Sequence, residues 1–197
     1  MTLFVPDADP QQPGRRAAAP SPLRLVQDFL NTTDLEDGVD ALSDPDALRA
    51  WLARHSLPGG DAPLDRADLD RVLTVREAFR ALLLANNGGA PNADAVATLN
   101  DVSREARLAV RFAPTGDASL LPACSGIHTA LGTLLAIVST ATVDGTWARL
   151  KACERDVCRW AFYDASKNRS GHWCSMAVCG NRRKASAYRR RRAAGMS

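Results

Sequence analysis

Four of the five cysteines in this chain of 197 residues fall in two pairs near its C-terminal end. Cys153 and Cys158 form the first pair, and Cys174 and Cys179 form the second. Four residues separate the members of each pair and fifteen separate the pairs. Structural zinc is almost always tetrahedral and takes its thiolates from short local segments. The duplicated spacing therefore predicts that the two pairs meet in space and bind one Zn²⁺ per chain.

Three other uses of four cysteines compete with zinc. Two disulfides are disfavoured because no secretory signal opens the sequence, and paired cysteines of a cytosolic protein more often bind a metal or act in catalysis. A redox pair is disfavoured because the two-residue gap of oxidoreductases is absent. An iron–sulfur cluster uses the same four thiolates, so spacing alone does not separate it from zinc. The strongly basic surroundings favour zinc.

The charge changes sign along the chain. Residues 1–148 contain 12 Lys/Arg and 19 Asp/Glu, a net charge of −7, whereas residues 149–197 contain 13 Lys/Arg and 3 Asp/Glu, a net charge of +10. Such a basic segment is typical of a surface that meets phosphates. A solvated basic tail is the competing interpretation, because a charge run alone is a weak signal. We expect two halves, with residues 1–148 able to fold alone.

The N-terminal half has the pattern of a helical domain. Residues 1–21 are rich in proline and alanine and are expected to form a mobile tail. Alternating apolar residues and turn residues predict a small β-hairpin between residues 108 and 121. Caps, stops and apolar residues at helical spacing predict helices over residues 22–32, 45–55, 95–106 and from residue 65 or 67 to 86, with Val96, Leu99 and Val102 facing inward on the fourth.

The longest run without charge, residues 124–143, is long enough in principle to cross a bilayer. Glycine, serine, threonine and His128 dilute it, so a buried helix over residues 123–143 is expected instead. We expect a cytoplasmic protein that does not contact the membrane. Cys124 and His128 would share one face of this helix, but a packed cysteine and a core histidine are the simpler interpretation.

The cysteine spacing also predicts how the C-terminal module folds. After a strand over residues 147–152, residues 153–158 would form a zinc knuckle, residues 159–163 would pair with residues 172–173, and a helix carrying Cys179 would begin at residue 175. A module this small cannot bury a sufficient core, so the metal would supply much of its folding energy. The side chains expected in its small core are Trp160, Phe162, Trp173 and Met176. The arginines expected to offset the negative charge of a tetrathiolate centre are Arg155, Arg159 and Arg182.

Beyond the cysteines, this module resembles the CGNR-type zinc finger of bacterial regulators, named after residues 179–182. Residues 25–32 are similar to the opening of the ABATE domain that usually precedes this finger. At residues 171–172, Gly-His replaces the two basic residues that many members carry, which thins the positive charge of that loop. The resemblance rests on Phe162, Asp164, Lys184 and on residues 166–168, 173–176 and 179–182.

The resemblance implies an ABATE-like domain over residues 22–146, a treble-clef-like finger over residues 147–197, and a stress-induced transcription regulator. The predicted fold class is α+β: a mostly helical N-terminal domain with a small β-hairpin, followed by the zinc finger. We expect a non-enzymatic, nucleoid-associated protein whose partner is double-stranded DNA. The N-terminal domain would bind a small-molecule ligand or form a homodimer.

Two alternatives remain open at this stage. An RNA-binding accessory protein would use the same basic finger on shape and phosphate. An enzyme would need a pocket with converging polar groups in the N-terminal domain. The residues expected to contact nucleic acid are Lys167, Arg169, Arg182, Arg183, Lys184, Arg189, Arg190, Arg191 and Arg192.

Overall fold

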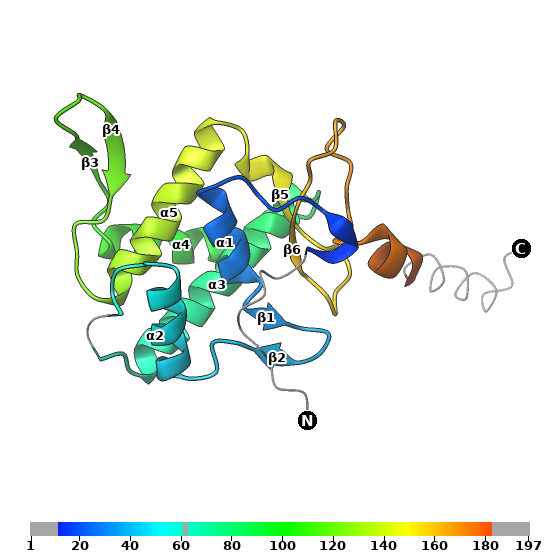
Figure 1. Cartoon of the computed structure of the whole chain (residues 1–197), viewed down its shortest axis with the longest axis horizontal. Helices are drawn as coiled ribbons and strands as arrows, with labels where there is room; N and C mark the ends of the chain where they lie inside the picture. Colours follow the sequence, from blue (N-terminus) through cyan, green and yellow to red (C-terminus); the bar gives the residue numbers. More distant parts are fainter. Residues whose placement is uncertain (1–11, 61–62, 183–197) are drawn as a thin grey trace, which may run out of the picture.

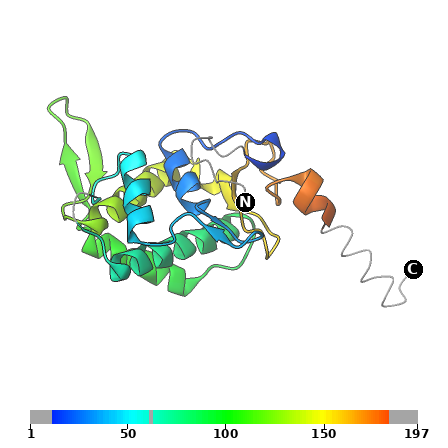
Figure 2. The ribbon, with the colours of Figure 1, turned by 60° about the horizontal axis from the view of Figure 1, so that its bottom comes forward.

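Five α-helices and three two-stranded antiparallel sheets make up residues 12–60 and 63–182, the part of the chain that the computed structural model describes (Figure 1). The helices form one body, the second sheet projects from one end of it, and the segment after the last strand lies at the other end (Figure 2). The helices are α1 (Leu23–Leu30), α2 (Pro45–Arg54), α3 (Arg66–Asn86), α4 (Ala93–Glu105) and α5 (Ile127–Val143). The strands pair as β1 (Thr33–Asp34) with β2 (Val39–Asp40), β3 (Ala109–Phe112) with β4 (Ala118–Leu121), and β5 (Leu150–Ala152) with β6 (Ala161–Tyr163).

Helix α3 is the longest helix of this body, and its first turn is capped from both sides. The Asp65 carboxylate accepts a hydrogen bond from the Asp68 amide at 2.9 Å, and the Asp68 carboxylate accepts one from the Asp65 amide at 3.1 Å. This reciprocal pair satisfies two amides that a helix start otherwise leaves unpaired. Helix α2 begins similarly, with Asp44 accepting from the Ala47 amide at 2.8 Å and Pro45 in the first helical position.

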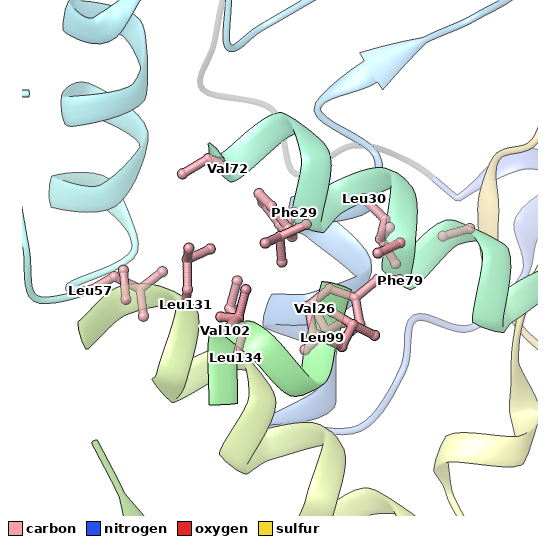
Figure 3. Close-up of a cluster of buried hydrophobic side chains, with 14 of the residues drawn as sticks. Val26, Phe29, Leu30, Leu57, Val72, Phe79, Leu99, Val102, Leu131 and Leu134 are labelled. Atoms are coloured by element: carbon pink, nitrogen blue, oxygen red, sulfur yellow. The ribbon is translucent and has the colours of Figure 1, made fainter. Parts of the chain in front are cut away.

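The main hydrophobic core lies where α3 meets the other helices (Figure 3). Phe29 from α1 and Phe79 from α3 are its largest fully buried side chains. Burying one large apolar side chain contributes about 1.5–3 kcal/mol, so this cluster supplies most of the favourable free energy of the body. The members labelled in Figure 3 are Val26, Phe29, Leu30, Leu57, Val72, Phe79, Leu99, Val102, Leu131 and Leu134.

The helices agree with the sequence prediction except at some ends and faces. Helix α1 begins at Leu23, and Ser21 makes no capping hydrogen bond. Helix α5 begins at Ile127 because Gly126, with φ 64°, interrupts the chain just before it. Cys124 therefore lies ahead of the helix and shares no helical face with His128. Val96, expected to face inward, is 44% exposed.

Strands β5 and β6 belong to the core of the helical body. Leu150, Ala152 and Ala161 are fully buried within the main cluster, and β5 packs on α3. Because β6 pairs with β5, the expected pairing of residues 159–163 with residues 172–173 is wrong; the knuckle is instead the turn between these strands. The strand expected over residues 147–152 begins as a 3₁₀ turn, η2 (Trp147–Arg149), and is extended only in β5.

Two asparagines of the helical body bind backbone groups of this last segment. Asn87, just after α3, donates to the carbonyls of Ala152 and His172 at 2.8 and 3.0 Å. Asn31, just after α1, bonds to both backbone groups of Ala161 at 2.9 and 2.8 Å. Since these groups are buried or half-buried, breaking the bonds would leave them unpaired away from water. From this packing we expect residues 1–148 alone to be less stable than a chain that also contains β5 and β6.

Two arginines on α3 are also buried, each 4% exposed. Arg80 donates to the Leu30 carbonyl at 2.7 Å and to the Arg159 carbonyl at 2.9 Å, so it ties α1 and the knuckle to α3. Arg76 donates to the Asp40 carboxylate and so fixes β2. Helical periodicity does not find such residues, because charged side chains are normally assigned to the exposed face.

Residues 12–21 lie against the protein, where the composition suggested a mobile tail over residues 1–21. Arg16 donates to the carbonyls of Trp173 and Cys174 at 2.8 and 2.9 Å, and its guanidinium lies 4.5 Å from the centre of the Phe162 ring. Ala19 is buried. Side-chain hydrogen bonds of Arg16 and Gln27 hold this segment, so a composition rich in proline and alanine does not reveal them. Residues 1–11 lie outside the described residues.

Candidate metal centre

The four cysteines of the two pairs meet at one point, as their spacing predicts. Their Sγ atoms all lie within 4.8 Å of one another. The Cys174 sulfur is 3.6 Å from the sulfurs of both Cys158 and Cys179. Cys153, Cys174 and Cys179 are buried, and Cys158 is half-buried.

The distances fit a zinc ion better than disulfides. All four cysteines are free thiols, and a separation of 3.6 Å is far beyond an S–S bond of about 2.05 Å. In a tetrahedron with Zn–S distances of about 2.3 Å, neighbouring sulfurs lie about 3.8 Å apart. The 3.6 Å separations are close to that value and all four sulfurs lie within 4.8 Å of one another, so one zinc ion fits between them once the longer separations shorten.

Three of the thiols also shift one another's pKa. Hydrogen bonds from the Cys158 and Cys174 thiols lower the pKa of Cys153 to about 2. The same sharing raises the pKa of Cys158 to about 12 and also raises that of Cys174. Four thiolates at this distance therefore need a cation between them, since each added negative charge disfavours the next.

Local structure aims each sulfur at the centre. Cys153 directly follows β5, and its amide donates to the Trp160 carbonyl at 2.9 Å, which closes the knuckle. Cys179 lies in a π-type turn, η3 (Met176–Gly180), whose start is capped by Ser175 accepting from the Val178 amide at 3.3 Å. The metal site thus sits at the beginning of this helical turn, as predicted.

The small core around the cysteines differs from expectation in one member. Phe162 is fully buried, and Trp160 and Trp173 pack half-buried against the cysteines. Met176 is 50% exposed, so it is not a core residue. Gly180 lies close to Met176 and Trp173: a Cβ atom at Gly180 would lie 2.5 Å from the Met176 sulfur and 3.2 Å from a Trp173 ring carbon.

Two arginines flank the metal centre and share one carboxylate. Arg155 donates through Nη1 to Oε2 of Glu36 at 2.6 Å. Arg182 donates to the other oxygen of Glu36. The hydrogen bond from Arg155 is the main reason that the pKa of Glu36 is lowered. Arg159 instead pairs with Asp156 on the knuckle.

A buried ion pair organises the loop that precedes the third cysteine. The Lys151 Nζ lies 3.0 Å from a carboxylate oxygen of Asp164, which is fully buried. Burial raises the pKa of Asp164, but hydrogen bonds from Ser166, Lys151 and the Gly171 amide outweigh this effect and hold it well below its usual range. Lys151 also donates to the carbonyls of Arg169 and Gly171, which fixes the loop to β5.

The residues expected to contact nucleic acid occupy different situations. Lys167 and Arg169 have exposed side chains in the loop after β6, and neither forms an ion pair among the described residues. Arg182 is half-exposed but bonded to Glu36. The remaining six, Arg183, Lys184, Arg189, Arg190, Arg191 and Arg192, lie outside the described residues.

Sequence reasoning missed three residues that build this site. Arg16 falls in the predicted tail, Lys151 falls in a predicted strand without a stated role, and the sequence pattern gives Glu36 no role. A charged residue at a strand position, as Lys151 is, was the one available signal of a buried partner. No local signal exists for Arg16 or Glu36, because their partners lie more than a hundred residues away in the chain.

Comparison with protein families agrees with this architecture. Residues 23–145 match the ABATE family, described as "Putative stress-induced transcription regulator", and residues 149–192 match the CGNR zinc finger. No curated protein matched the chain in the same comparison. Neither family is an enzyme family, and no helix in the described ranges has the length and apolar character needed to span a bilayer. The chain belongs to the ABATE family and carries a CGNR zinc finger, in which Cys153, Cys158, Cys174 and Cys179 form a site for one zinc ion.

Proposed function

We propose that the protein regulates transcription by binding duplex DNA through the surface around its zinc finger. The family descriptions support a regulatory role, and the charge distribution supports a polyanionic partner. The observation that carries the proposal is the exposure of two basic side chains in the loop that leads to the third cysteine. Lys167 and Arg169 are exposed in the loop that precedes Cys174, and in the sequence the turn that carries Cys179 is followed by the basic residues 183–192.

Several Lys and Arg side chains near the finger already bind other groups of the protein, so fewer are available to contact DNA phosphates. Lys151 is buried in its ion pair, and Arg149 donates to the carbonyls of Asp164 and Ser166. Arg155 and Arg182 are engaged by Glu36. We therefore assign backbone contacts first to Lys167, Arg169 and the basic residues of 183–192. Such contacts supply affinity and register, whereas sequence is read at base edges.

The test is a binding titration of the zinc-loaded full chain against duplex DNA at several salt concentrations. With four to six phosphates neutralised, the log–log slope of affinity against salt should be about −4 to −5. The same titration with structured RNA distinguishes duplex DNA from RNA as the partner. Equal or tighter binding to RNA at the same salt concentration would contradict the proposal.

The matched variants compare two groups of four arginines. Replacing Arg189 to Arg192 by alanine should flatten the salt slope by up to about 3.6 units and weaken binding to every DNA sequence alike. The control replaces four exposed arginines of the helical body, which removes the same charge elsewhere and should change the slope little. These control residues are Arg49, Arg66, Arg104 and Arg111.

The helical body offers a site for the signal that such a regulator would need. An open apolar groove of about 300 Å³ lies between α3, α4, α5 and β4, with Asn100, Ser103 and Ser139 as its polar lining. This volume is at the lower end of the range for small-molecule sites. We propose that it takes a small apolar ligand. Widening it by Leu135→Ala should strengthen binding of a fluorescent apolar probe, and filling it by Ser139→Phe should abolish that binding.

A further inference from the structure

The carboxylate of Glu36 sits between two guanidinium groups of the finger. Each of its oxygens accepts from one arginine: Oε2 from Arg155 at 2.6 Å and Oε1 from Arg182. The two non-bridging oxygens of a phosphodiester present a similar pair of acceptors with the same charge. Arginine is well suited to either ligand because its planar donors match both carboxylate and phosphate. The geometry is that of an oxyanion site with a protein side chain in it.

The segments that carry the cysteines set the backbone positions of the two arginines. The Arg155 carbonyl accepts from the amides of Cys158 and Arg159 at 2.9 and 3.1 Å, and Arg182 lies three residues after Cys179, just past the turn η3. The attachment points of both guanidinium groups therefore do not depend on the acidic residue. Donors that are brought together in this way can accept another ligand of the same shape and charge.

Glu36 comes from a small element that can leave without unfolding the body. It lies in the turn of the β1–β2 hairpin, whose strands have two residues each, and the amides of Glu36 and Asp37 donate to the Asp34 side chain. The base of the hairpin is held separately, by the bond from Arg76 to Asp40. The side chains of Glu36 and Arg182 are 35% and 54% exposed. Ion pairs at such exposure add little stability, so a polyanion can compete for the arginines.

We propose that Arg155 and Arg182 form a phosphodiester-binding site of the finger, and that Glu36 occupies this site in the free protein and competes with the DNA backbone. This inference rests on the proposed function, since DNA supplies the phosphate. The acidic turn of the body thereby lowers the DNA affinity of the finger, and any event that displaces the turn raises it.

The test compares Glu36→Gln with Asp37→Asn in the full zinc-loaded chain. Both variants remove one negative charge from the same exposed turn, but only Glu36 contacts the arginines. One added phosphate contact steepens the salt slope by about 0.9, so E36Q should bind duplex DNA about tenfold more tightly near 0.1 M salt. D37N should change affinity less than about threefold, as expected for a long-range charge effect. Zinc content and melting temperature should match the wild type.

A second variant tests whether the arginines bind the additional phosphate in E36Q. Adding Arg182→Gln to E36Q should cancel the gain in affinity and restore the wild-type salt slope. Equal affinities of E36Q and D37N, with the wild type binding DNA, would overturn this inference alone. Loss of zinc from E36Q would also overturn it, because Glu36 would then support the metal centre. Failure of the wild type and every variant to bind duplex DNA would overturn the proposed function and this inference together.

Discussion

The helical body and the zinc finger are stabilised by different interactions, yet they share strands β5 and β6. The body is held by apolar side chains around α3. The finger is held by four sulfurs, a buried ion pair and side chains that bind backbone carbonyls. Strands β5 and β6 belong to both, since their apolar residues lie in the body's core and their turn carries the first two sulfurs. The metal therefore orders the outer part of the finger, while the body orders its base.

The largest effect should follow from removing one sulfur. Metal binding contributes about 10–16 kcal/mol in structural zinc sites, so Cys174→Ser should release the zinc and unfold residues 153–158 and 166–182. Helices α1 to α5 and strands β5 and β6 should stay protected, as measured by hydrogen exchange with metal analysis.

The control for that variant is Cys124→Ser, which changes the fifth cysteine, outside the cluster. It should keep one zinc per chain and the wild-type exchange pattern. Simultaneous loss of protection in the helices of Cys174→Ser would contradict the comparison, because body and finger would then be one cooperative unit.

Truncation tests where the body ends. A chain of residues 1–148 lacks Leu150, Ala152 and Ala161 of the core, whereas a chain of residues 1–165 keeps them. Truncating a buried leucine alone costs about 2–5 kcal/mol, so the shorter chain should be less stable than the longer one by about 4 kcal/mol or more. Denaturant unfolding of both chains measures this difference. Equal stabilities would restore the boundary at residue 148.

The buried ion pair should give the next largest effect. Lys151→Met leaves the Asp164 carboxylate buried without its cation, which should cost about 3–5 kcal/mol of unfolding free energy at neutral pH. The exposed Lys167→Met is the matched control and should cost less than about 0.5 kcal/mol.

The pH dependence of this variant follows from the sign of the Asp164 shift. In the wild type the folded-state pKa is lowered, so the stabilisation is complete above the unfolded pKa near 3.9 and is lost as the pH falls through the folded pKa. Removing the ammonium group removes one of the interactions that lower the pKa of Asp164, so this pKa lies higher in the variant than in the wild type. The deficit of Lys151→Met should therefore be largest at neutral pH and shrink as the pH falls through the folded-state pKa of the variant; a deficit that stays constant down to acid unfolding would exclude the charge as its cause.

The smallest loss of stability should follow from removing the hydrogen bonds between the helical body and β6. Asn31→Ala removes two hydrogen bonds to Ala161 and leaves a buried amide and carbonyl weakly satisfied, at a cost of about 1–3 kcal/mol. Zinc affinity should be unchanged, because Ala161 lies on the body's side of the boundary. A chelator titration alongside thermal unfolding checks both, and weakened zinc binding would place β6 with the metal instead.

The sequence predicted what depends on local patterns. The repeated cysteine gap located the metal centre, and caps, stops and apolar residues at helical spacing located α2 and α3 within a residue. It did not predict the partner of β6, because any apolar strand at residues 161–163 satisfies the same pattern whether it meets β5 or residues 172–173. Polar contacts between residues far apart in the chain, such as those of Arg16 and Glu36, produce no periodic pattern in the sequence. They can be identified only from the folded structure.

The bond between Arg16 and Cys174 joins residues 158 positions apart in a chain of 197. During synthesis residues 12–19 emerge well before their partner carbonyls, which follow about 157 residues later. Contacts of such sequence separation form slowly and late in folding. A nascent chain can therefore collapse its helices early, whereas residues 12–19 acquire their docking site only when the third cysteine has left the ribosome. Binding of the metal and docking of residues 12–19 thus become possible at the same stage of synthesis.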